Sequence, residues 1–178
     1  MSTLSNFIGF QVCWFACVLG AAHSLEWIGP LVVLAWCGLC VRTARGRVRE
    51  ALALLTVGGL GALVAAVELH FGWLEFRGAS LSPRIAPAWI VALWIAFAST
   101  FEASLRWVTR RPALAAAFAL VGAPLSYLAG ERFGSLTVVG PRTTALVGIG
   151  VLWAFALPLA AWGYRRLSGR AQTAVNGK

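Results

Sequence analysis

Residues 51–68 read ALALLTVGGLGALVAAVE, an apolar stretch in which the only charged residue is the last one, Glu68. A helix rises 1.5 Å per residue, so about 20 apolar residues cross a hydrocarbon core of about 30 Å. Gly58, Gly59 and Gly61 stand near the middle, and small residues of this kind let helices approach closely in lipid. The stretch therefore predicts a transmembrane helix with an ionisable group at one end.

The rest of the chain repeats this pattern. Of the 178 residues, 60% are hydrophobic and 12% are charged, whereas soluble domains have about 25% charged residues. Apolar blocks of spanning length predict transmembrane helices at 4–22, 27–45, 51–68, 86–105, 112–129 and 144–162. We therefore expect an all-α fold, a polytopic membrane helix bundle of six spans. Residues 1–164 would form the transmembrane domain and residues 165–178 a short basic tail.

The basic residues predict how the bundle is oriented, because Lys and Arg are enriched in cytoplasmic loops. If the N-terminus is cytoplasmic, the outer loops hold only Arg77, Arg84, Arg132 and Arg142, and every other basic residue falls on the inner side. The inverse orientation would place most of the basic residues outside. We therefore predict that both the N-terminus and the C-terminus are cytoplasmic.

The net charge of +9 does not predict a nucleic-acid partner. The basic residues sit in short loops between spans rather than on one face with interleaved aromatic rings, which is the pattern of a nucleic-acid interface. Loops of this kind meet the anionic headgroups of membrane lipids instead. Membrane lipids are accordingly the expected partners, together with a second copy of the chain or a membrane enzyme.

Ionisable groups gather on the predicted outer side. His23 and Glu26 lie between the first two spans, Glu68 and His70 end the third, and Tyr127 lies near the outer end of the fifth. Imidazole, carboxyl and phenol groups within reach of one another can relay protons or act as acid and base. These five residues are the candidate catalytic group, with solvated loop residues as the alternative interpretation. Their spacing does not supply three or four metal ligands, so we predict no metal and no cofactor.

Two glutamates stand out by position. Glu68 closes an apolar run, and an ionisable residue at membrane depth is a functional-site candidate; the alternative is a carboxylate that reaches out to water. Glu102 lies four residues before Arg106, a spacing that predicts an ion pair on a helix. Glu102 is expected near the inner surface, so it is not expected to meet Tyr127.

The cysteines raise the possibility of redox chemistry. Cys37 and Cys40 form a CxxC pair, the arrangement used by thiol oxidoreductases. The topology places this pair near the cytoplasm, where thiols are kept reduced, and no second pair stands in an outer loop. Cys13 and Cys17 fall in a stripe of small residues with Gly9 and suit helix packing. Small apolar packing residues are therefore the favoured interpretation, and a membrane thiol oxidoreductase is the third functional hypothesis.

The chain resembles a family of small bacterial inner-membrane proteins of unknown function. The matching motifs are Pro87-x-Trp89, Leu93-Trp94, Phe97-Ala98, Ser104-Leu105-x-Trp107, Pro112, the run GAPLSYLAG at 122–130, Asn6-Phe7, and Gln11 followed by Trp14-Phe15. The resemblance implies a multi-pass protein of the inner membrane of a Gram-negative bacterium. The family more often has Asp at the position of Glu68 and Asn at that of Glu102. Its members are similar to proteins encoded beside enzymes that resemble cyclopropane-fatty-acid synthases, which implies a link with lipid modification.

Two main functional hypotheses follow. In the first, the protein is a subunit, scaffold or enzyme in the modification of membrane-lipid acyl chains, with a cleft lined by the outer-face groups and by the fifth span, which Pro124 is expected to kink. In the second, it is a small transporter or permease coupled to protons through Glu68. Transport ranks second because few polar residues fall at the predicted midplane, where transport sites are expected.

Overall fold

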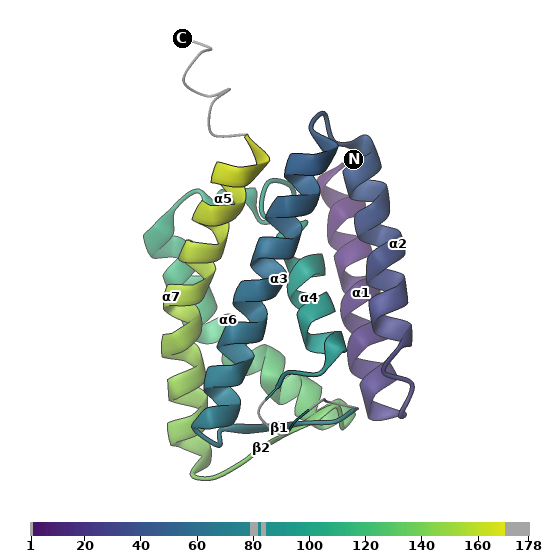
Figure 1. Ribbon diagram of the computed structural model, residues 1–178. Coiled ribbons are helices and arrows are strands. Elements are labelled where there is room, and N and C mark those ends of the chain that lie inside the picture. The colour runs from purple at the N-terminus through teal and green to yellow at the C-terminus, as the bar shows by residue number, and fades with distance from the viewer. Residues whose placement is uncertain (1, 79–81, 83–84, 170–178) are drawn as a thin grey trace.

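The computed structural model describes residues 2–78, 82 and 85–169, and they form a bundle of helices with one small sheet (Figure 1). The elements are α1 (Thr3–Ala22), α2 (Ile28–Thr43), α3 (Arg47–His70), β1 (Leu74–Phe76), α4 (Ala88–Ala98), α5 (Arg106–Thr109), α6 (Pro112–Phe133), β2 (Leu136–Val138) and α7 (Arg142–Ser168). The first turn of α1 and the last turn of α7 lie at one end of the bundle, which we call the α5 end. The strands lie at the opposite end, the sheet end.

The prediction of a membrane helix bundle is confirmed, whereas the predicted number of six spans is not. Within the described residues, four helices are long and apolar enough to cross a membrane: α1, α3, α6 and α7. Helix α2 is also apolar and has 16 residues, whereas α4 has only 11. At 1.5 Å per residue these two helices are about 24 Å and 16 Å long. Large apolar side chains such as Leu34, Leu63 and Phe155 are exposed around the bundle, as expected where helices face lipid.

The predicted fourth span is helical only in its first half. We expected a helix over 86–105, but α4 ends at Ala98 and the chain continues through turns to α5. Local bonds favour this break, because the Ser99 and Thr100 hydroxyls donate to the carbonyls of Ala96 and Phe97 at 2.7 and 2.6 Å, and such bonds compete with the helical ladder. Non-helical backbone is tolerated at membrane depth where protein surrounds it, and Thr100 and Phe101 are buried.

A buried asparagine holds this irregular segment against α1. Asn6 donates from Nδ2 to the carbonyl of Ser99 at 3.1 Å, and its Oδ1 accepts from the backbone and hydroxyl of Ser104 at 3.2 and 2.7 Å. Trp36 of α2 donates to the Ser99 hydroxyl at 3.1 Å. The amide of Asn6 therefore replaces part of the hydrogen bonding that a continuous helix would have supplied.

Replacement of Asn6 by Ala is expected to destabilise the protein by about 1–3 kcal/mol, because it leaves buried backbone and hydroxyl groups without partners. Thermal unfolding in detergent, followed through exposure of the buried cysteines to a thiol-reactive dye, measures the change. Thr56→Ala is the control, since the Thr56 side chain is exposed and bonds only to Leu52 of its own helix. Equal melting temperatures for the two variants would contradict this role of Asn6.

The sequence did not predict the small sheet. Strands β1 and β2 pair antiparallel, with Leu74 opposite Val138 and Phe76 opposite Leu136. The sheet joins the segment after α3 to the segment after α6, and Leu74, Leu136 and Val138 are buried beneath it. Each strand has only three residues, which is too short for an alternating pattern to be recognised.

Small residues mark the closest contacts between helices, as predicted. A Cβ atom placed on Gly61 of α3 would lie 2.1 Å from Cγ of Trp94 in α4, and one on Gly29 of α2 would lie 2.6 Å from the Cα of Cys17 in α1. Pro124 lies inside α6, where it has no N–H group to donate to the carbonyl of Leu120. A Cβ on Gly150 of α7 would lie 2.6 Å from that oxygen, so the glycine permits α6 and α7 to approach there.

Two further predictions concern the cysteines and the chain end. All four cysteines are free; Cys13, Cys17 and Cys37 are buried, and Cys37 donates weakly from Sγ to the carbonyl of Ile95 at 3.9 Å. The first residues of the predicted tail, 165–168, are the end of α7. Residues 170–178 of that tail lie outside the described residues.

Candidate functional site

Glu68 is fully buried in the last turns of α3, with 0% of its surface exposed. Tyr127 of α6 donates its hydroxyl hydrogen to Oε2 at 2.8 Å, and Trp153 of α7 donates from its indole nitrogen to Oε1 at 3.1 Å. Each carboxyl oxygen therefore has one donor, and both donors are neutral. The alternative in which Glu68 reaches out to water is wrong, because α6 and α7 cover the side chain completely.

The rings around Glu68 are held by further packing. Trp153 stacks on Trp94 of α4 with ring centroids 4.3 Å apart and planes inclined by 29°. Tyr127 meets the same Trp153 ring edge to face at 6.2 Å. Trp94 in turn packs over Gly61, two turns before Glu68 in α3. Four helices thus fix the donors of one carboxyl group, which is the arrangement expected of a preorganised site.

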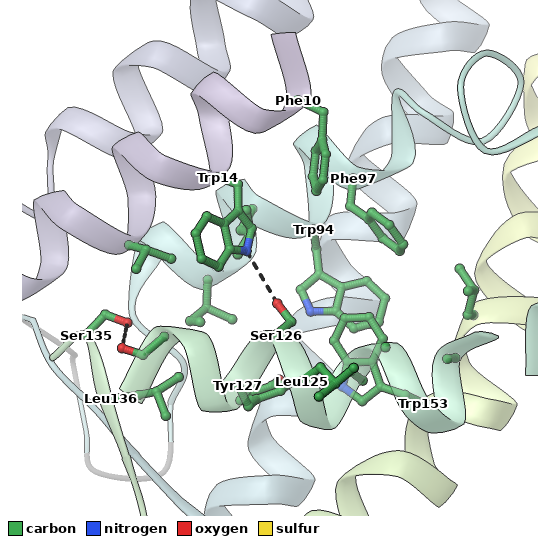
Figure 2. Close-up of a pocket in the computed structure, with 18 of the residues that line it drawn as sticks. Phe10, Trp14, Trp94, Phe97, Leu125, Ser126, Tyr127, Ser135, Leu136 and Trp153 are labelled. Carbon is green, nitrogen blue, oxygen red and sulfur yellow. Dashed lines mark hydrogen bonds between the residues drawn. The ribbon is translucent and has the colours of Figure 1, made fainter. Parts of the chain in front are cut away.

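A pocket of about 500 Å³ opens beside this group, between α1, α4, α6 and α7 (Figure 2). Its size falls within the range of about 300–1,000 Å³ typical of small-molecule sites. Tyr127 and Trp153 belong to its wall, so the pocket reaches the two donors of Glu68. Most of the lining is apolar or aromatic, including Phe10, Trp14, Trp94, Phe97, Phe118 and Leu125.

The pocket is open between α1 and α6. Leu125 and Phe118 of α6 line it and are 60% and 40% exposed. Toward the sheet end, Trp14 and Phe15 of α1 meet Phe133 of α6 edge to face at 6.1 Å and close the gap. Trp14 also donates to the hydroxyl of Ser126 at 3.4 Å (Figure 2). The opening lies on the side of a bundle whose outer faces are apolar, so it faces the region that lipid would occupy.

The structure brings together only part of the predicted outer group. Glu68 and Tyr127 are bonded to each other, but His23 and His70 are exposed at the sheet end. Glu26 is partly buried and packs near Gly78. Within the described residues no set of three or more His, Cys, Asp or Glu side chains could hold a metal ion.

Trp153 is the member of the site that sequence reasoning missed. Trp94 and Trp153 both lie within predicted spans, at 86–105 and 144–162, where a tryptophan is most simply interpreted as a packing residue. Burial of an indole N–H requires a hydrogen-bond partner, and Glu68 is a buried acceptor at the matching end of the bundle. That requirement was the available signal, but the sequence does not reveal which indole meets which carboxyl group.

A second buried carboxyl group occupies the first turn of α3. Glu50 is 5% exposed and accepts a hydrogen bond from the hydroxyl of Tyr164 in α7. The chain has only two tyrosines, and both of them donate to a buried glutamate of α3. At 1.5 Å per residue the two glutamates are about 27 Å apart along the helix, so they form separate pairs at opposite ends of the bundle.

Glu102 forms its predicted ion pair in a different setting. Its Oε2 lies 3.6 Å from Nε of Arg106 and 3.0 Å from Nη2 of Arg110, although residue 102 belongs to the turns and not to a helix. Glu102 therefore lies at the α5 end, whereas Tyr127 is bonded to Glu68 nearer the sheet end. Glu102 and Tyr127 do not meet, as predicted. This ion pair anchors the α5 segment and has no part in the pocket.

Comparison with known proteins identifies the family of the chain. A family model with the description "Protein of unknown function (DUF2878)" matches residues 3–159. The matched part runs from α1 into α7, and it includes Glu68, Tyr127, Trp153 and every residue of the pocket wall. No curated protein and no solved structure matches the chain.

Proposed function

Because this chain belongs to the DUF2878 family, whose function is unknown, we infer its activity from its own geometry. We propose that the aromatic pocket holds the acyl chain of a membrane lipid. The protein would serve as a subunit, scaffold or enzyme in acyl-chain modification. It would lie in the inner membrane of a bacterium with both termini cytoplasmic. Its partners would be membrane lipids and a membrane enzyme or a second copy of the chain.

The pocket and its opening are the observation that carries this proposal. An acyl chain requires an apolar cavity that can be entered from the bilayer, and this pocket is lined by aromatic and aliphatic side chains and opens between α1 and α6. Chemistry on a chain requires polar groups at a defined point along it. Tyr127 supplies such a group, because its ring lines the pocket while its hydroxyl is bonded to Glu68.

Glu68→Gln and Tyr127→Phe are expected to abolish the protein's effect on membrane lipids. Glu68→Gln removes the ionisable group at nearly constant shape, and Tyr127→Phe removes the hydroxyl between the carboxyl group and the pocket. The measurement is a lipidomic comparison of membranes from cells without the gene and from cells that carry the wild-type gene or a variant. A specific change in acyl-chain composition should depend on the wild-type gene and disappear in both variants.

His70→Gln is the matched control, because His70 lies two residues after Glu68 on the same helix but is exposed. It should preserve the wild-type lipid profile at equal protein level. If the profiles with and without the gene are the same, the role in lipid modification is wrong. If the profiles differ but both variants behave as the wild type, the protein acts on lipids without this site.

A second function, proton-coupled transport, is favoured by one observation. Glu68 is completely enclosed between apolar helices, and ionisable groups in such positions carry protons in many pumps and transporters. Reconstituted into liposomes, a transporter of this kind would show proton flux dependent on its substrate, and Glu68→Gln would lose it. Unaltered flux in Glu68→Gln would exclude Glu68 as the coupling residue.

A further inference from the structure

Trp94 carries a hydrogen-bond donor that the fold leaves unused. Only 3% of its surface is exposed, and its ring is fixed between Trp153 and Gly61. Among the residues that the structure describes, none accepts a hydrogen bond from the Trp94 indole nitrogen. Four other tryptophans, Trp14, Trp36, Trp89 and Trp153, each donate to an oxygen atom. Among the described residues, Glu102 Oε1 is the fully enclosed side-chain polar atom without a partner, so the Trp94 nitrogen is reached from the pocket space. A ligand that excludes water from the pocket would therefore gain by accepting from it.

This donor lies in the wall of the pocket. Trp94 is one of the residues that line it, and Figure 2 shows the indole nitrogen on the side of the ring that faces the other lining residues. Two neighbouring polar groups are already engaged, since Tyr127 donates to Glu68 and Ser126 accepts from Trp14. An occupant of the pocket would therefore meet the Trp94 N–H group in a wall that is mostly apolar, with the amide of Gln11 as a further polar group on the α1 side.

The chemistry of the surroundings restricts the acceptor that fits. An oxygen atom on the occupant can accept from Trp94, whereas a pure hydrocarbon leaves the donor unpaired. A free carboxylate would have to leave water for a wall that is mostly apolar, and burial of a charge without an opposite charge or several hydrogen bonds is costly. A neutral carbonyl oxygen satisfies the donor without that cost.

We propose that the pocket binds an esterified acyl chain and that the indole N–H of Trp94 donates to its ester carbonyl. The inference rests on the proposed acyl-chain pocket and adds the chemical class of its ligand. Trp94 would set the depth at which the carbonyl stops, and so determine which part of the chain reaches Tyr127. Trp94 is therefore a ligand-binding residue, whereas Tyr127 is the pocket residue that bonds to the carboxyl group of Glu68.

The experiment measures displacement of tritiated methyl oleate from the purified full-length protein in dodecyl maltoside. The competitors are unlabelled methyl oleate, oleic acid and 1-octadecene, which has a similar chain without an oxygen atom. The wild-type protein should bind methyl oleate about 3- to 10-fold more tightly than 1-octadecene, the effect of one neutral hydrogen bond. Trp94→Phe should remove that preference while 1-octadecene still binds with wild-type affinity.

Trp107→Phe is the control variant, because Trp107 is exposed at the α5 end and is not part of the pocket wall. It should keep the preference for the ester. The comparison of ligands on the wild-type protein tests the inference even if Trp94→Phe does not fold.

Each contrary result has a separate meaning. No saturable binding of methyl oleate would overturn the acyl-chain pocket itself. Equal affinity for methyl oleate and 1-octadecene would retain the pocket and overturn the role of Trp94. Tighter binding of oleic acid than of methyl oleate would show that the ligand is a free acid and not an ester.

Discussion

Gly61→Ala is expected to destabilise the protein by about 1–3 kcal/mol, the usual effect of overpacking a close-packed interior. The added Cβ would lie 2.1 Å from Cγ of Trp94, which is on the axis of χ2, so turning the ring about that bond cannot relieve the clash. Trp94 would have to move, and with it the stacked Trp153 that donates to Glu68. The variant should therefore lose stability and disturb the pocket at the same time.

Gly59→Ala provides a matched control for this variant. Gly59 lies in the same helix two residues away, and a Cβ at this position would meet no atom within 4 Å. Alanine is a better helix former than glycine, so Gly59→Ala should be as stable as the wild type or more stable. Both variants carry the same chemical change, and only the neighbourhood differs.

Thermal unfolding in detergent measures the difference. A thiol-reactive dye reports when the buried Cys13, Cys17 and Cys37 become accessible, and a Cys40→Ala background removes the partly exposed thiol. A change of 1 kcal/mol shifts the melting temperature by about 2–4 °C for a chain of this size. Equal melting temperatures for Gly61→Ala and Gly59→Ala would contradict the close packing of α3 against Trp94.

Tyr127→Phe is expected to destabilise the protein by about 1–3 kcal/mol, because it leaves Oε2 of Glu68 buried without a donor. The ring itself is preserved, so its edge-to-face contact with Trp153 remains. The loss measures the hydrogen bond together with the desolvation of the carboxyl group that it leaves behind.

The double variant Glu68→Met with Tyr127→Phe separates these contributions. When both partners of a buried hydrogen bond become apolar at similar shape, the change can be nearly neutral. The double variant should therefore be more stable than Tyr127→Phe alone, although the Trp153 N–H group then lacks its acceptor. If Tyr127→Phe melts at the wild-type temperature, the bond between Tyr127 and Glu68 does not hold the site together.

Glu68 differs from the other buried glutamate of α3, Glu50, in what surrounds its tyrosine partner. Two buried glutamates of α3 each have a tyrosine partner, but only Glu68 has a tyrosine that also lines a pocket. A buried carboxyl group is costly in lipid, so a purely structural role is a weak explanation for it. Tyr127 connects Glu68 to the pocket wall, and Tyr164 does not do so for Glu50.

Membrane placement and the helical class could be predicted from the sequence because they depend on local composition. Any chain segment with enough apolar residues to cross the hydrocarbon core must satisfy its backbone hydrogen bonds internally, which enforces helices. The same locality explains why Glu68 was recognised as a candidate, since it stands at the end of an apolar run. Its pairing with Tyr127 could only be suspected, because the two residues are 59 positions apart in the chain.

The remaining features depend on contacts between distant segments. The break of the fourth span after Ala98 depends on the bonds of Asn6 in α1 to Ser99 and Ser104, and a sequence window around residue 99 does not contain that asparagine. The three-residue strands exist because the ends of α3 and α6 lie side by side. The pocket likewise needs side chains from four helices, and the unused donor of Trp94 becomes evident only when every possible partner is in place. Local apolar patterning thus determines that this chain forms membrane helices, whereas the tertiary packing of those helices alone decides which polar groups are paired, which are left free, and where a ligand can enter.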